Sequence, residues 1–301
     1  MRRDSSSASM RRARTCAIAI LLGVAVSGSA SAQLPVLRAR ALDATAAVKV
    51  FNPAGSIRLV GWDRDSIVVR GRVARGSHFF FGGSSRGVKL GIEDPVNGGD
   101  SRPSDLVIYL PRASRMSIKS ASADIAGTDV SGWFYSVSGS IQLAGSATSL
   151  EAETMNGAID LAATVPWVRA RTGDGTLTLR GSAEDVDLST IAGTLNVVST
   201  SVRRGRFASV TGDIHVLGAP RDDALIELSS HEGAVDLRLP RSVSGVFDLS
   251  TIGGTIENGF TDARPAASST TRTRTLRVRL GSGGAHVTVR TFKGAIRLNP
   301  R

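Results

Sequence analysis

One unit of 18 to 21 residues repeats along most of the chain, and it limits what the chain can fold into. Each copy reads apolar, any, apolar, any, Ser or Thr, any, any, Gly, any, Ile or Leu, any, Leu or Val. A unit this short cannot bury an apolar face alone, so the copies are expected to stack and share one core. The copies align on Gly55, Gly139, Gly157, Gly175, Gly193, Gly212, Gly233, Gly254 and Gly294, with Ala123 in the same place of a weaker copy.

The columns on either side of the glycine predict two short strands in each copy. The residue two places after the glycine is aliphatic throughout, from Ile57 to Ile296, and the residue five places before it is apolar from Val50 to Val289. This alternation is typical of a strand buried on one face. Three places before the glycine stands Ser, Thr or Asn, whose side chain can bond the backbone at a corner. The glycine itself is expected to supply a positive φ or to admit a neighbouring backbone.

These columns predict an all-β fold, a β-solenoid (single-stranded β-helix-like) of about ten coils of 18–21 residues, in which each coil pairs with the next one along the sequence. A β-propeller is disfavoured because its blades need about 40 residues. Two stretches break the period: residues 72–104, predicted to be a loop or hairpin insertion, and residues 259–283. Similar phrases, Leu110-Pro111-Arg112 and Leu239-Pro240-Arg241, stand near the breaks.

Residues 1–32 are predicted to be a signal peptide, followed by one domain over 33–301. Five arginines precede the apolar run from Cys16 to Val26, and Ala30-Ser31-Ala32 offers a cleavage site before Gln33. Without these residues the formal charge of +11 falls to +7, and the single cysteine is lost. No later stretch approaches the roughly 18 apolar residues of a membrane-spanning helix. The protein is therefore expected to be exported to the periplasm, the cell surface or the medium.

No arrangement of residues predicts catalysis, a metal site or a cofactor. The four histidines of the chain are scattered, so they do not form the closely spaced set that a zinc site needs. The sequence therefore favours a structural or binding module over an enzyme. The alternative is a β-helix carbohydrate-active enzyme, a polysaccharide lyase or glycosidase. For it, Asp236 and Glu257 on adjacent coils would stand near 5 Å apart, as in a retaining pair.

Two groups of residues are candidate partner-binding sites: Phe79, Phe80 and Phe81 in the insertion, and Arg272, Arg274, Arg277 and Arg279 near the C-terminus. The phenylalanines either cap an open end of the solenoid or contact a partner. The arginines could attract an anionic polysaccharide, which makes electrostatic binding of an envelope polymer a further alternative. No nucleic acid is expected as a partner. The chain has four Lys against 33 Arg, a bias that genome composition also explains. Trp62, Trp133 and Trp167 are expected at corners or in the core.

The sequence resembles the bacterial putative-adhesin family of unknown function, whose members carry a head-type adhesin domain. The resemblance rests on the run from Val48 to Ile57, on Gly61-Trp62-Asp63, on Leu110-Pro111, and on Gly281-Ser282-Gly283-Gly284 before Thr291-Phe292-Lys293-Gly294. It covers most of residues 45–299. It implies a secreted or envelope-located, β-solenoid-like domain with an unknown envelope component or protein as partner, and it carries over no catalytic residues.

Overall fold

The computed structural model describes residues 33–94, 101–268 and 270–301; the predicted signal peptide lies outside the described residues. The described residues form strands and no helix, so no helix among them could cross a membrane. The strands are β1 (Gln33–Ala41), β2 (Ala47–Phe51), β3 (Gly55–Trp62), β4 (Ser66–Ala74), β5 (His78–Ser84), β6 (Gly87–Glu93), β7 (Ser104–Pro111), β8 (Arg115–Ser120), β9 (Asp124–Thr128), β10 (Ser131–Ser136), β11 (Ile141–Ser146), β12 (Ser149–Thr154), β13 (Ile159–Thr172), β14 (Leu177–Thr190), β15 (Leu195–Ser209), β16 (Ile214–Leu217), β17 (Leu225–Ser230), β18 (Val235–Leu239), β19 (Gly245–Thr251), β20 (Ile256–Asn258), β21 (Ala266–Ala267), β22 (Arg274–Leu280), β23 (His286–Thr291) and β24 (Ile296–Pro300).

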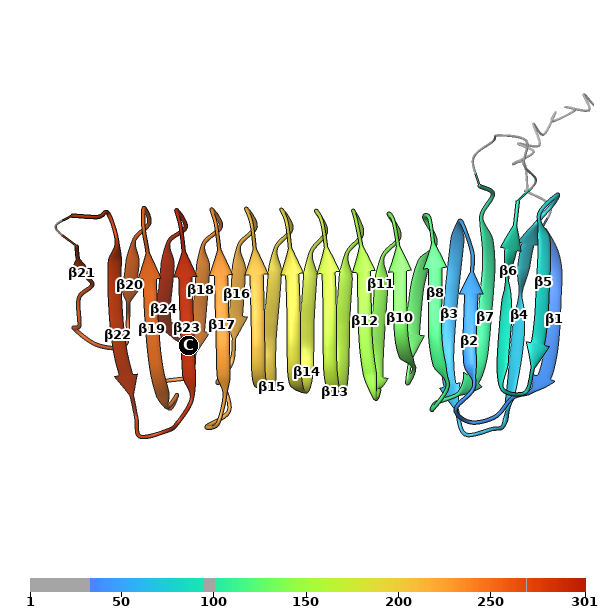
Figure 1. The fold of residues 1–301 in the computed structure, drawn as a ribbon, viewed down its shortest axis with the longest axis horizontal. Coiled ribbons are helices and arrows are strands. Elements are labelled where there is room, and N and C mark those ends of the chain that lie inside the picture. Colours follow the sequence, from blue (N-terminus) through green and yellow to red (C-terminus); the bar gives the residue numbers. More distant parts are fainter. Residues whose placement is uncertain (1–32, 95–100, 269) are drawn as a thin grey trace, which may run out of the picture. The chain divides into compact units, whose positions relative to one another are not determined.

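The strands pair into two long stacks, which we call sheet 1 and sheet 2 (Figure 1). Sheet 1 holds the strand before each corner, and its pairing order is β5, β6, β2, β8, β10, β12, β13, β14, β15, β17, β23, β19, β22, β21. Sheet 2 holds the strand after each corner, in the order β1, β4, β7, β3, β9, β11, β13, β14, β15, β16, β18, β24, β20. The long strands β13, β14 and β15 contribute to both sheets. The predicted β-solenoid-like fold is confirmed.

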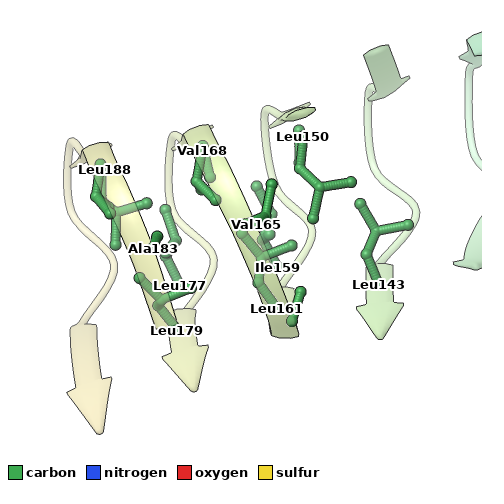
Figure 2. Packing of buried hydrophobic residues seen from close by; sticks show 14 of the residues in the cluster. Leu143, Leu150, Ile159, Leu161, Val165, Val168, Leu177, Leu179, Ala183 and Leu188 are labelled. Carbon is green, nitrogen blue, oxygen red and sulfur yellow. The ribbon is translucent and has the colours of Figure 1, made fainter. Parts of the chain in front are cut away.

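The core lies between the two sheets and consists of the predicted columns. Ile159, Leu177 and Leu195 are register partners on consecutive strands, and all three are buried. Figure 2 shows Ile159 and Leu177 among the buried side chains. The column five places before the glycine is buried in every coil, including Phe134 and Phe207. Like side chains therefore pack on like side chains along the whole stack, and this arrangement supplies the apolar burial that one unit lacks.

Most corner glycines are required for space, not for backbone conformation. Among the glycines that align the repeat, only Gly55 has a positive φ, of 104°. A Cβ on Gly193 would lie 1.9 Å from the carbonyl oxygen of Gly175, and one on Gly175 would lie 1.8 Å from that of Gly157. No side chain fits at such distances, so the glycines form a ladder of close backbone contacts. The sequence offered two reasons for a glycine at the corner, a positive φ and a close neighbouring backbone. The close backbone applies at most corners.

The hydroxyl residue joins two coils at several corners, although the buried Oγ atoms of Ser209 and Ser230 have no hydrogen-bond partner among the described residues. Thr172 Oγ1 accepts a hydrogen bond from the amide of Gly175 at 3.2 Å and donates one to the carbonyl of Gly157 at 3.0 Å. Thr154 makes the same pair of contacts one coil earlier. These buried side chains satisfy backbone groups where the ladder is interrupted, as the sequence predicts.

At both ends of the stack the coils do not follow the order of the sequence, which corrects the expectation that each coil pairs with the next. The last coil, β23 with β24, lies between the coil of β17 with β18 and the coil of β19 with β20. The first coil, β2 with β3, lies between β6 with β7 and β8 with β9. The cause is local: antiparallel strands β4 and β22 lead the chain back before a parallel coil is added.

The two Leu-Pro-Arg phrases stand where the chain steps over an inserted coil. Ser114 donates its amide to the carbonyl of Pro111 at 3.0 Å, and Val243 does the same to Pro240 at 2.9 Å. The first turn leads from β7 past β3 to β8, and the second from β18 past β24 to β19. Within residues 72–104, β5 and β6 form an antiparallel hairpin, and β6 with β7 makes the outermost parallel coil at that end.

Candidate binding face

The outward face of sheet 1 carries two rows of side chains that run across the strands. Parallel strands in register place equivalent positions beside one another at about 4.8 Å. The first row reads Lys89, Lys49, Ser117, Trp133, Glu151, Arg169, Asp187. The second row reads Phe80, Gly91, Phe51, Lys119, Tyr135, Glu153, Arg171.

At the β5 end these rows form what we call the lysine–aromatic face. Strand alternation produces it: on β2, Val48 and Val50 are buried while Lys49 and Phe51 are exposed. The face contains three of the four lysines of the chain, and it would not exist if β2 paired with β8 alone. Its members are Lys49, Phe51, Phe80, Lys89, Lys119, Trp133 and Tyr135.

Two of the ammonium groups lie against aromatic rings of this face. Lys89 Nζ is 5.3 Å from the centroid of Phe80, and Lys119 Nζ is 5.3 Å from that of Trp133. Trp133 and Tyr135 stack, with ring centroids 5.7 Å apart and planes at 16°. Cation–π contacts of this kind restrict long lysine side chains without neutralising their charge.

A shallow groove crosses the face between Phe80 and Phe51. Gly91 lies between them in register, and the ring of Phe80 reaches over it, its Cζ 3.0 Å from where a Cβ would stand. Lys49, Lys89 and Lys119 line the groove together with Glu93. Among the residues that the structure describes, none of these three lysines makes an ion pair.

Farther along the outward face of sheet 1, on strands β12, β13 and β14, the charged side chains neutralise one another. Arg169 stands between Glu151 and Asp187, with nitrogen–oxygen distances of 3.8 Å to each. Arg171 adds a contact of 4.0 Å to Asp187. The middle of sheet 1 therefore lacks the excess of positive charge that the lysine–aromatic face carries.

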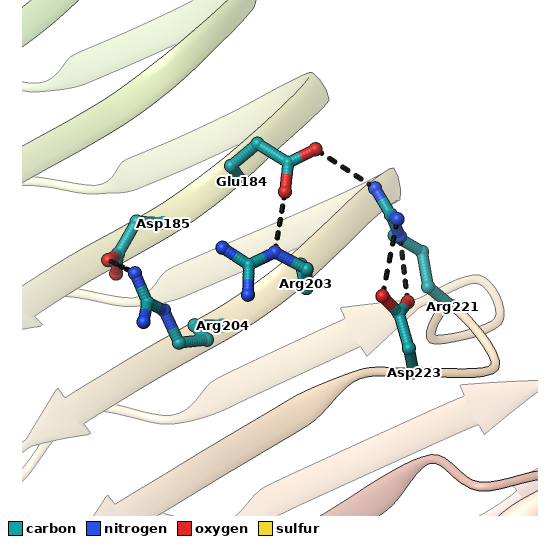
Figure 3. Close-up of polar contacts among 6 residues, drawn as sticks. All are labelled: Glu184, Asp185, Arg203, Arg204, Arg221 and Asp223. Atoms are coloured by element: carbon teal, nitrogen blue, oxygen red, sulfur yellow. Dashed lines mark hydrogen bonds and ion pairs between the residues drawn. The ribbon is translucent and has the colours of Figure 1, made fainter.

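A second cluster of charges fixes the loop between β16 and β17 to the stack (Figure 3). Arg203 Nε donates to Glu184 at 2.6 Å, and Arg221 reaches both Glu184, at 3.1 Å, and Asp223, at 3.0 Å. The hydrogen bond from Arg203 lowers the pKa of Glu184, and the one from Arg221 lowers the pKa of Asp223. Arg203 and the similarly paired Arg204 are thus committed to carboxylates within the chain.

The structure separates the two predicted partner-binding groups to opposite ends of sheet 1. Phe79 and Phe81 of β5 pack against the core, while Phe80 faces outward on the lysine–aromatic face. The arginines gather on and beside β22 at the far edge. Arg277 lies 3.4 Å from Asp248, Arg274 donates to the carbonyl of Gly254 at 2.5 Å, and Arg272 and Arg279 are exposed.

The predicted carboxylate pair is wrong, because Asp236 and Glu257 are not on adjacent coils. Arg297 of the inserted coil lies between them in register, and its Nε is 3.5 Å from Glu257. Asp236 is 6% exposed and is bonded by Arg238 at 3.1 Å. In the described part of the chain no three His, Cys, Asp or Glu residues are grouped as metal ligands.

Sequence reasoning missed Lys49, Lys89 and Lys119 as a group. Lys49 and Lys119 lie in or next to the repeat, but Lys89 lies in a stretch without the period. The sequence has only four lysines, and this rarity could have drawn attention to these three. That they lie together could not be predicted, because it depends on the order of the coils. Trp133 also differs from its expected place, since it faces outward beside Lys119.

The fold and this face define an all-β repeat protein that offers extended surfaces for binding. Residues 28–299 match the family described as Toastrack DUF4097, and the chain belongs to this family. The resemblance to the putative-adhesin family is thereby confirmed.

Three solved structures are similar to this chain at low sequence identity. A protein from Parabacteroides distasonis described as a putative lipid binding protein is 9% identical, with a TM-score of 0.53 over 88% of this chain and 96% of that one. A putative adhesin from Bacteroides fragilis is 10% identical, with a TM-score of 0.45 over 89% and 98%. A putative adhesin from Parabacteroides merdae is 9% identical, with a TM-score of 0.47 over 88% and 96%. No curated protein matches the sequence.

Proposed function

We propose that this protein is an exported, non-catalytic, adhesin-like module of the bacterial cell envelope, which binds an envelope component through the lysine–aromatic face. The observation that carries the proposal is the face itself: three exposed lysines that make no ion pair with a described residue stand beside four aromatic rings, next to charges that are neutralised. Family membership supports the adhesin-like role, and the signal-peptide pattern of residues 1–32 supports export to the envelope.

Isolated bacterial envelopes test the binding role. The purified protein is expected to co-sediment with envelopes, and the triple variant Lys49→Gln, Lys89→Gln, Lys119→Gln is expected to lose most of this binding. The matched control removes the same number of charges at the other end of sheet 1, through Arg272→Gln, Arg277→Gln and Arg279→Gln. If the control loses binding and the lysine variant keeps it, the electrostatic alternative through the predicted arginines replaces this proposal.

Export is tested separately by sequencing the N-terminus of the protein recovered from bacteria that express the full sequence. Cleavage between Ala32 and Gln33 is expected. A cytoplasmic protein that retains Met1 would contradict the envelope role.

A further inference from the structure

We infer that the ligand of the lysine–aromatic face is an acidic polysaccharide, a linear glycan whose sugar rings carry carboxylate groups. This inference rests on the proposed function and adds to it the chemical class of the ligand.

The placement of the lysines calls for an anion. Lys49 and Lys89 are register partners on β2 and β6, so two like charges stand on neighbouring strands. Lys119 adds a third charge beside Phe51. Like charges in direct register oppose folding, and among the described residues no ion pair offsets them. A polyanion along the rows would relieve this repulsion on binding.

The aromatic rings narrow the class of anion. Phe51 is 40% exposed, and Phe80 and Trp133 are half-buried beside ammonium groups. A small inorganic ion would use the lysines and leave the rings unused. The C–H face of a sugar ring can pack on an aromatic ring while a carboxylate on the same sugar reaches a lysine. Strand β2 carries both partners, Lys49 and Phe51, and its neighbours β6 and β8 add a lysine each. The outer strands β5 and β10 of the face supply further rings.

The face also has the form of a track for a linear polymer. It extends over β5, β6, β2, β8 and β10, which at one strand spacing per step is about 19 Å. Single-stranded nucleic acid uses free ring faces on which its bases stack. Here Lys119 lies over Trp133 and Tyr135 stacks on the same indole, so no run of free ring faces is left for successive bases, whereas the exposed Phe51 still offers one ring to a sugar. A lipid bilayer would engage several rings that protrude, whereas of the four rings of this face only Phe51 is exposed, and Phe80, Trp133 and Tyr135 are half-buried. These contacts favour a glycan.

Defined polymers test the inference. Calorimetric titration with polygalacturonate is expected to show binding that weakens as salt rises, and the fully methyl-esterified polymer is expected to bind at least tenfold more weakly. Lys49→Gln with Lys89→Gln should weaken polygalacturonate binding at least tenfold. Phe51→Ala, which leaves the charge unchanged at an exposed position, should weaken it several-fold. The control Arg272→Gln, Arg277→Gln, Arg279→Gln should bind like the unmodified protein, and circular dichroism should be unchanged in all variants.

Titrations with other polymers and with vesicles test whether the ligand belongs to a different class. Dextran sulfate binding as tightly as polygalacturonate would overturn the carboxylate assignment in favour of a general polyanion. Tighter binding to an oligothymidylate or to phosphatidylglycerol vesicles would overturn the glycan. If envelopes bind through the lysines but no acidic polysaccharide does, this inference fails and the proposed function stands. If the lysine variant binds envelopes normally, both fail.

Discussion

Lys49 and Lys89 stand side by side on the parallel strands β2 and β6, as register partners with exposed side chains. Neither makes an ion pair among the described residues, whereas the next charged side chains along the same row alternate in sign. The repulsion between them is therefore a property of the folded protein, and it can be measured without a ligand.

Replacing Lys49 by Gln is expected to stabilise the free protein. Like charges beside each other on paired strands are destabilising, and single cross-strand pairs are worth about 0.2–1 kcal/mol, so the free energy of unfolding in urea should rise by about 0.5 kcal/mol at low salt. The gain should shrink at high salt because exposed charges are screened. Lys293→Gln is the control, since its ammonium lies 2.5 Å from Glu232 and its loss should not stabilise. A destabilised Lys49→Gln protein would contradict the interpretation of the face.

A methyl group at a corner glycine is expected to break the contact between coils. In Gly193→Ala the new Cβ would meet the carbonyl oxygen of Gly175 at 1.9 Å, and in Gly294→Ala it would meet that of Gly233 at the same distance. Overpacking against backbone costs about 1–3 kcal/mol or more. In Gly82→Ala the methyl group meets nothing within 4 Å, and stability should not change by more than about 0.5 kcal/mol. Chemical unfolding of the three variants makes the comparison, and a tolerated Gly294→Ala would argue against the inserted coil.

The corner hydroxyl can be removed without changing the shape of the side chain. Thr172→Val leaves the amide of Gly175 and the carbonyl of Gly157 without their side-chain partner. Burying unpaired polar groups costs about 1–3 kcal/mol, so the melting temperature should fall. Thr176→Val is the matched control, because Thr176 is exposed and lies four residues away. Equal effects of the two substitutions would show that the hydroxyl bonds do not stabilise the corner.

The sequence predicts the buried columns of the fold but not the order of the coils. The repeat predicted the buried columns through Ile159 and Phe134 because strand alternation is a local property. It did not predict that Arg297 separates Asp236 from Glu257, because coil order is set where antiparallel strands β4 and β22 turn the chain back. The lysine–aromatic face was missed for the same reason.

The ion pairs at the β16–β17 loop predict a pH dependence with a defined sign. Arg203 lowers the pKa of Glu184 below its ordinary 4.5, so this carboxylate favours the folded state at pH values above 4.5, and that contribution is lost as pH falls through the lowered value. Arg203→Gln should raise the pKa of Glu184 toward 4.5 in a carboxyl NMR titration. Arg206→Gln, which removes a neighbouring charge with no contact to Glu184, should leave it nearly unchanged. An unshifted Glu184 in the unmodified protein would contradict the ion pair.

The account depends most on the insertion of β2 between β6 and β8, which brings the three lysines together. Disulfide formation tests this order, because it needs Cα atoms about 4.4–6.8 Å apart and adjacent strands lie about 4.8 Å apart. Cys16→Ser removes the chain's own thiol, and pairs of cysteines then replace Lys49, Lys89 and Ser117. Oxidation should join positions 49 and 89, and positions 49 and 117, but not 89 and 117. Efficient joining of 89 to 117, with no product from either pair that includes 49, would contradict the coil order and remove the face.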